Sequence, residues 1–105
     1  MRVEITEVVR IEEHQTLSLA ELADLSRLSE ADLLELLECG VIAPTGSAAG
    51  RPSFGAECLI AARAASRLKE ELDLDAHSVA VVLALLERIR RLEAGLRSLE
   101  ARGQT

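Results

Sequence analysis

The side chains that most often carry out chemistry, the imidazoles and thiols, are few in this 105-residue sequence and are not grouped. His14 and His77 are the only histidines, and neither lies near a cysteine in the sequence. We expect them to have surface or helix-capping roles. Cys39 and Cys58 match no metal-ligand spacing, which predicts buried free thiols, with a disulfide or a thiol sensor as the alternative. The sequence therefore predicts no enzyme, no bound metal and no cofactor.

Carboxylates are far more numerous, and they are concentrated in the first part of the chain. Residues 1–45 carry ten acidic and three basic side chains, whereas residues 46–105 carry eight acidic and nine basic ones, and the net charge is −6. One predicted helix contains four acids and no base, and we expect these acids on its exposed face: Glu30, Asp32, Glu35 and Glu38. They either keep the helix soluble or form a binding site for a basic protein partner.

Nucleic acid is a poor match for this charge distribution. A DNA-binding helix-turn-helix places its second helix in the major groove, where Lys and Arg contact the phosphates. Here the helix at that place is acidic, and the loop that follows supplies only Arg51. Phosphates would repel such a surface, so the sequence predicts that duplex DNA is not a partner.

Two short helices must hold these acids, and each has its own N-terminal cap. The run Ser18-Leu19-Ala20-Glu21 has the spacing of a capping box and predicts a first helix over residues 19–25. Ser29 is a second N-cap, and acids in the first turn of its helix suit the helix dipole. That helix should end at Cys39, because Gly40 can adopt the left-handed conformation that closes a helix. Two capped helices joined by about three residues are the helix-turn-helix plan.

Apolar spacing predicts which helix faces are buried. In the second helix, Leu34 lies at the margin of a stripe made of Leu33, Leu36 and Leu37, and the acids lie with Ala31 on the opposite side. A third helix is expected over residues 53–72, with one buried face made of Cys58, Ala61, Ala65, Leu68 and Leu72.

The segment between the second and third helices is rich in Gly, Ser and Pro, which predicts a loop that is mobile at residues 46–50. Val41-Ile42 and Phe54 flank this loop, so it can form a two-stranded wing. Gly46 and Gly50 lack the Lys-Ser/Thr pair and the strand-to-helix setting of a phosphate-binding loop. The sequence therefore predicts no phosphate-binding loop in this segment.

The last helix, with Asp75 as its N-cap, has the clearest periodicity in the chain. Alternating spacings of three and four residues, typical of coiled-coil a and d positions, connect Val82, Leu85, Ile89, Leu92, Leu96 and Leu99. Residues 79–86 are apolar nearly all round and are expected to pack into the body, whereas the second half of the helix should project. An apolar seam in water predicts a partner helix, most simply that of a second protomer. Arg88 and Glu93 suit a parallel pair.

These features predict a mainly α-helical protein of one compact domain, with a winged head over residues 1–75 and a coiled-coil dimerisation helix over residues 76–105. Residues 3–6 alternate between apolar and polar and predict a short strand. No apolar run reaches the roughly 18 residues that would span a bilayer. Residues 1–4 do not resemble the start of a signal peptide, so a cytoplasmic protein is expected.

Two stretches of the sequence resemble the chaperone modulatory protein family, whose CbpM-like members have a MerR-type winged-helix head. The first is residues 28–44, in which an acidic helix that begins with Ser-Glu is followed by Gly-Val-Ile-Ala-Pro. The second is residues 67–75, Arg-Leu-Lys-Glu-Glu-Leu-Asp-Leu-Asp, followed by the apolar start of the last helix at residues 79–83. Residues 76–78 depart from the family, which often has an aromatic residue and Pro-Gly there. The resemblance covers most of residues 18–100.

The resemblance implies a regulator that binds the J-domain of a DnaJ-like co-chaperone, of the curved-DNA-binding protein A type, and inhibits its work with an Hsp70-type chaperone. J-domains carry a basic helix that meets Hsp70, which agrees with the acidic head. The resemblance also suggests an antiparallel coil. Two alternatives remain: a MerR-like DNA-binding transcription regulator, which would need a basic second helix or wing, and a structural coiled-coil adaptor, which would not need two capped helices before the coil.

Overall fold

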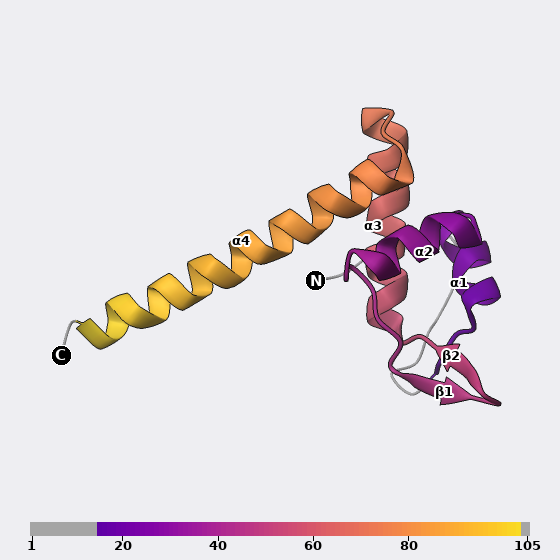
Figure 1. Ribbon diagram of the computed structural model, residues 1–105, viewed down its shortest axis with the longest axis horizontal. Helices are drawn as coiled ribbons and strands as arrows, with labels where there is room; N and C mark the ends of the chain where they lie inside the picture. Colours follow the sequence, from indigo (N-terminus) through magenta and orange to yellow (C-terminus); the bar gives the residue numbers. More distant parts are fainter. Residues whose placement is uncertain (1–14, 104–105) are drawn as a thin grey trace.

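In the computed structural model, which describes residues 15–103, the chain forms four helices and a two-stranded sheet (Figure 1). The elements in chain order are α1 (Leu19–Ser26), α2 (Glu30–Glu38), β1 (Gly46–Ala48), β2 (Arg51–Ser53), α3 (Ala56–Leu72) and α4 (Ala76–Gly103). The predicted mainly α-helical fold with a short β wing and a long C-terminal helix is confirmed. The strand expected at residues 3–6 lies outside the described residues, as does His14.

Both helices of the helix-turn-helix begin with a capping box, as the sequence predicts. In α1, the Ser18 Oγ accepts a hydrogen bond from the Glu21 amide at 3.1 Å, and the Glu21 carboxylate accepts one from the Ser18 amide at 3.0 Å. In α2, Asp32 has the role of the glutamate: its amide donates to the Ser29 Oγ at 3.0 Å, and its carboxylate accepts from the Ser29 amide at 3.3 Å. Arg27, with φ 65°, closes α1 in the left-handed conformation. Local sequence therefore fixes where α2 begins.

The two-stranded wing forms within the segment rich in Gly, Ser and Pro, as expected from its apolar flanks. β1 and β2 are antiparallel, and residues 46–48 belong to β1, so the expectation of a loop at residues 46–50 holds only for the turn between the strands. The tip residues Ala49 and Gly50 have φ values of 53° and 75°. Positive φ at both central residues is the conformation of the tight turn that suits the twist of a hairpin, and glycine adopts it without strain.

The residues that flank the wing pack in the core and do not belong to the strands of the wing. Ile42 is buried, and Phe54, the one aromatic residue of the chain, is completely buried. The backbone of Phe54 exchanges two hydrogen bonds with Leu17, at 2.7 and 2.8 Å, in an isolated antiparallel bridge. This bridge attaches the chain before α1 to the base of the wing.

The core lies where α3 passes between α1 and α4, and α2 also packs against α4 (Figure 1). Its fully buried large side chains come from every helix and from the end of the wing: Leu22, Leu33, Leu36, Phe54, Leu59 and Val79. Small side chains at Ala62 and Ala65 of α3 are also buried and allow neighbouring backbones to approach closely. The expected stripe of α2 is confirmed for Leu33 and Leu36, whereas Leu34 is exposed.

The buried face of α3 differs from the predicted one. α3 begins at Ala56, because the expected start at Ser53 belongs to β2. Cys58 and Ala65 are buried as predicted, but Leu59 and Ala62 complete the face, and Leu72 is 55% exposed. The C-terminal end of α3 runs beyond α2, so its last turn has little of the core beside it (Figure 1).

α4 contributes only its first turns to the core and then leaves the head as a projecting rod (Figure 1). The predicted N-cap is confirmed, since the Asp75 carboxylate accepts a hydrogen bond from the Ser78 amide at 2.7 Å. Val79 and Ala80 are buried, but the expectation that residues 79–86 all pack into the body was wrong. Leu83 still packs against the core and Ala84 is half-buried, whereas the residues on the other side of the helix are exposed, and Leu85 is 54% exposed.

Candidate functional site

The four acids predicted to bind a partner all lie on α2, but they do not share one environment. Glu30 and Glu38 are exposed, whereas Asp32 and Glu35 are half-buried. Each of the half-buried carboxylates contacts a basic side chain from another helix. The acidic face of α2 is therefore partly neutralised by the protein itself.

Asp32 is paired with Lys69 near the C-terminal end of α3. The Lys69 Nζ lies 3.0 Å from the Asp32 Oδ2, and the Asp32 side chain is 17% exposed. Partial burial alone would raise the pKa of Asp32, but the hydrogen bonds from Lys69 and from the Ser29 backbone, together with the Lys69 charge, lower it below its usual range. The carboxylate thus caps α2 and also ties α2 to α3.

Glu35 is paired with His77 in the first turn of α4. The His77 Nδ1 lies 3.0 Å from the Glu35 Oε2, on a largely exposed part of the surface. The hydrogen bond to Glu35 and the charge of Glu35 raise the pKa of His77, which favours the imidazolium. Smaller contributions in the same direction come from Asp75 and Glu38. The predicted surface role of His77 is confirmed.

The expectation that the four acids form one solvated face is wrong for Asp32, whereas the Glu35 side chain is 37% exposed but has a partner in His77. Their partners Lys69 and His77 lie 37 and 42 residues further along the chain, so no local signal in the sequence could reveal the pairs. The acids that the described chain leaves unpaired are Glu30 and Glu38. Together with Leu34, which is 52% exposed, they form an acidic surface with an apolar centre on α2.

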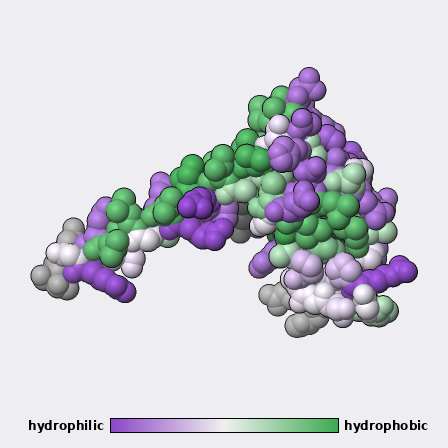
Figure 2. Space-filling model, in the orientation of Figure 1, coloured by the Kyte–Doolittle hydropathy of each residue, from purple (hydrophilic) through white to green (hydrophobic). Residues whose placement is uncertain are grey.

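The second candidate surface is the apolar seam of α4. Its six predicted residues are between 38% and 64% exposed, and they are Val82, Leu85, Ile89, Leu92, Leu96 and Leu99. Figure 2 shows hydrophobic side chains continuing along one edge of the projecting helix, with hydrophilic ones beside them. An apolar strip of this length on an otherwise charged rod is unusual for a surface that stays exposed to water.

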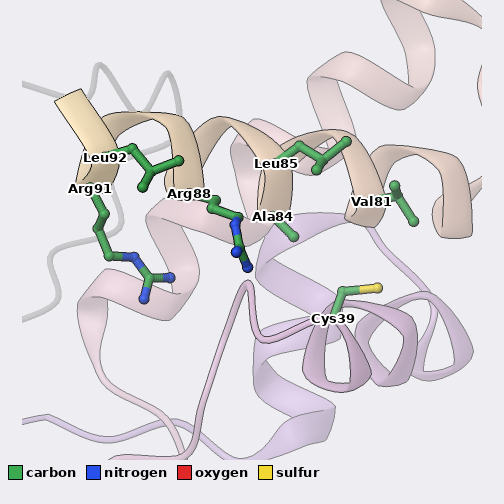
Figure 3. Close-up of a pocket in the computed structure, with 7 residues that line it drawn as sticks. All are labelled: Cys39, Val81, Ala84, Leu85, Arg88, Arg91 and Leu92. Carbon is green, nitrogen blue, oxygen red and sulfur yellow. The ribbon is translucent and has the colours of Figure 1, made fainter.

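An open cleft of about 600 Å³ lies between the end of α2 and the first half of α4 (Figure 3). Cys39 lies on the α2 side, and the α4 side presents apolar residues and two guanidinium groups: Val81, Ala84, Leu85, Arg88, Arg91 and Leu92. Cys39 and Cys58 are both free, and only Cys58 is buried, where its thiol donates to the Ala43 carbonyl at 3.1 Å. The prediction of buried free thiols is therefore confirmed for Cys58 alone.

Other classes of site have little support in the described part of the chain. Between residues 15 and 103, no cluster of three His, Cys, Asp or Glu side chains is arranged to hold a metal ion. None of the helices described is long and apolar enough to cross a membrane. The exposed side of α2 carries no cation, and Arg51 is the one basic residue of the wing strands.

Two comparisons place the sequence among known proteins. Residues 3–101 match the family described as MerR HTH family regulatory protein. The sequence is also 31% identical over 100 residues to proteins named "Chaperone modulatory protein CbpM" from two strains of Coxiella burnetii, Dugway 5J108-111 and RSA 331 / Henzerling II. Each match covers 95% of this chain and 94% of the relative. These matches cover the head and α4 alike, and the chain belongs to the MerR-type helix-turn-helix family, as a CbpM-like chaperone modulatory protein.

Proposed function

We propose that this protein is a homodimeric cytoplasmic chaperone modulator that binds the J-domain of a DnaJ-like co-chaperone and inhibits its co-chaperone activity. Its relatives are named chaperone modulatory proteins, and the J-domain is the partner that the family resemblance implies. The observation that carries the proposal is the acidic surface on α2, which lies where a DNA-binding relative would need cations. Inhibition requires only that the partner's basic helix be occupied, so no covalent chemistry is involved.

Charge complementarity gives the four acids of α2 different roles in this interface. Glu30 and Glu38 are free to attract a basic helix during encounter, and Leu34 between them offers an apolar contact once the surfaces meet. Asp32 and Glu35 add to the field at longer range, but Lys69 and His77 reduce their share. The partner-binding residues proposed are therefore Glu30, Asp32, Glu35 and Glu38, with the first and last as the direct contacts.

The test reverses the two unpaired acids, Glu30→Lys and Glu38→Lys, in one variant. Association with a purified J-domain should become at least about tenfold slower at low salt, and its salt dependence should weaken, because complementary charge acts mainly on the rate of encounter. Surface plasmon resonance at several salt concentrations measures both. The matched control reverses Glu93 and Glu100 on the projecting part of α4, where the net charge changes equally. Equal association rates for the parent and the α2 variant would remove α2 from the interface.

The name of the matching family also supports a second candidate function, that of a MerR-like transcription regulator that binds duplex DNA. The acidic α2 opposes it, since few cations are present to release counterions from phosphate. Fluorescence anisotropy with mixed-sequence duplex DNA at physiological salt should therefore show no binding. Salt-sensitive binding in the micromolar range would instead favour this second candidate.

A further inference from the structure

The contact between Glu35 of α2 and His77 of α4 lies outside the core and can open without disturbing it. The His77 Nδ1 is 3.0 Å from the Glu35 Oε2, and the two side chains are 67% and 37% exposed, respectively. The same two helices also contribute buried apolar side chains to the core, and these are Leu33, Leu36, Val79 and Ala80. Separation of the imidazole from the carboxylate would therefore leave the packing of α2 against α4 in place.

The groups around His77 are mainly acidic in the described part of the chain. The carboxylate bound to the imidazole has the largest effect on its pKa, which it raises, and Asp75 and Glu38 raise it further. Lys69 of α3 is close enough to act on Asp75 as well, but its Nζ is paired with Asp32 at 3.0 Å. The imidazole itself gains or loses a proton near neutral pH. Its protonation therefore decides how much negative charge this corner of the molecule presents.

Glu35 borders the acidic surface formed by Glu30, Leu34 and Glu38. Residues three positions apart are neighbours on a helix, so Glu35 lies beside Glu38, and both act on His77. A cation of a partner that binds Glu38 therefore comes within reach of Glu35. A protonated His77 holds the Glu35 carboxylate and repels that cation, because like charges oppose each other. When His77 is neutral, Glu35 can exchange its hydrogen bond with the imidazole for a stronger, charged one with the partner.

We propose that a basic side chain of the partner replaces His77 at Glu35, and that binding of the partner therefore releases a proton from His77 to the solvent. This inference rests on the proposed function, in which the partner is the basic helix of a J-domain. The complex then holds fewer protons than the separate proteins, so the affinity increases as the pH rises through the range in which the imidazole titrates. His77 is thus a positioning residue that regulates access to Glu35.

Binding of a purified J-domain to the parent and to His77→Gln, near pH 6 and near pH 8, tests the coupling. Gln keeps a hydrogen-bonding side chain but takes up no proton. From pH 8 to pH 6, the parent should lose at least about threefold more affinity than His77→Gln, because release of one proton changes an affinity by up to about tenfold for each pH unit. Titration of groups in the J-domain affects both proteins alike and cancels in this comparison. Calorimetry in two buffers with different heats of ionisation should show more protons released by the parent.

Two acids of α2 provide matched control variants. Glu35→Gln removes the carboxylate for which His77 and the partner compete, so it should reduce the pH dependence of binding. Glu30→Gln removes the same charge from the first turn of α2, away from the imidazole, and should weaken binding while the pH dependence stays. An equal pH dependence in the parent and in His77→Gln would overturn the coupling and leave the proposed function intact. Absence of binding at both pH values would instead contradict the proposed function, and this inference with it.

Discussion

At the scale of single residues, the acids of α2 divide into two that the protein neutralises and two that it leaves available. Lys69 and His77 reach Asp32 and Glu35 from the two ends of the α3–α4 turn, so these pairs fasten α2 to the corner of the molecule. The imidazole of His77 changes its charge within the physiological range of pH, so the second pair responds to pH. This makes His77 the residue whose role can be isolated by titration.

The pKa of His77 is raised in the folded protein, so its pair with Glu35 stabilises the fold at a pH below the ordinary pKa of histidine. That stabilisation should be lost as the pH rises through the raised pKa. We therefore expect His77→Gln to lower the midpoint of urea denaturation near pH 5.5 and to leave it unchanged near pH 8. The effect should be small, because the pair is exposed.

Two further variants check this assignment. Glu35→Gln should remove the same difference between the two pH values, because it deletes the other member of the pair. The pKa values of Asp32 and Asp75 are lowered, and their contributions to stability are present above the ordinary pKa of aspartate and lost only as the pH falls well into the acid range. A difference between parent and His77→Gln that was equally large near pH 8 would show that His77 acts through packing, not through its charge.

At the scale of elements, the sequence predicts well those features that depend only on residues close together in the chain. Ser18 with Glu21 and Ser29 with Asp32 fix the starts of α1 and α2, because a capping box closes within four residues. The segment that forms the wing could be predicted, but the bounds of its strands could not, since they depend on the positive φ values of Ala49 and Gly50 and not on β-forming side chains. The buried face of α3 depends on the neighbours that the fold brings to it, which apolar spacing alone cannot identify.

The same distinction holds for the candidate site. The acids and the seam of α4 can be found from composition and periodicity, because both are repeated along one helix. The pairing of Asp32 with Lys69 and of Glu35 with His77 could not be found from the sequence, because each pair joins helices that only the tertiary fold brings together. The point at which α4 leaves the head, just after Ala84, was also hidden, since residues on both sides of it are equally apolar.

At the scale of the whole molecule, the shape is governed by α4. The molecule measures 50 × 34 × 29 Å, and its longest dimension comes from the projecting half of this helix (Figure 1). A single helix in water gains no tertiary packing along that half, and its apolar strip stays exposed. Pairing two such strips would bury the seam and place two acidic heads in one assembly. A dimer of this kind would present two acidic surfaces, and it would gain avidity toward a partner in which two J-domains are linked.

The dimer is therefore the last prediction, and the seam residues Val82, Leu85, Ile89, Leu92, Leu96 and Leu99 are its proposed interface. Leu92→Asp with Leu96→Asp should weaken association by about ten-thousandfold, because four leucines are lost per dimer and covering each one contributes roughly 1.5 kcal/mol. Sedimentation velocity should then show a species of 11.3 kDa in place of one twice as heavy. Ala94→Asp with Ser98→Asp adds the same charge on the opposite face of α4 and should leave the dimer intact.

An unchanged sedimentation coefficient for the Leu92 and Leu96 variant would rule out the seam as the interface, whatever the state of the parent. Where the dimer does depend on the seam, its orientation follows from engineered disulfides. In a parallel coil, Val82→Cys alone should cross-link two chains, since equal positions face each other. In an antiparallel coil centred on the seam, Val82 faces Leu99, and only the Val82→Cys and Leu99→Cys pair should react. The antiparallel arrangement would carry the distal end of each α4 past the partner's head, so that Arg97 and Arg102 come closer to the acids of the partner's α2.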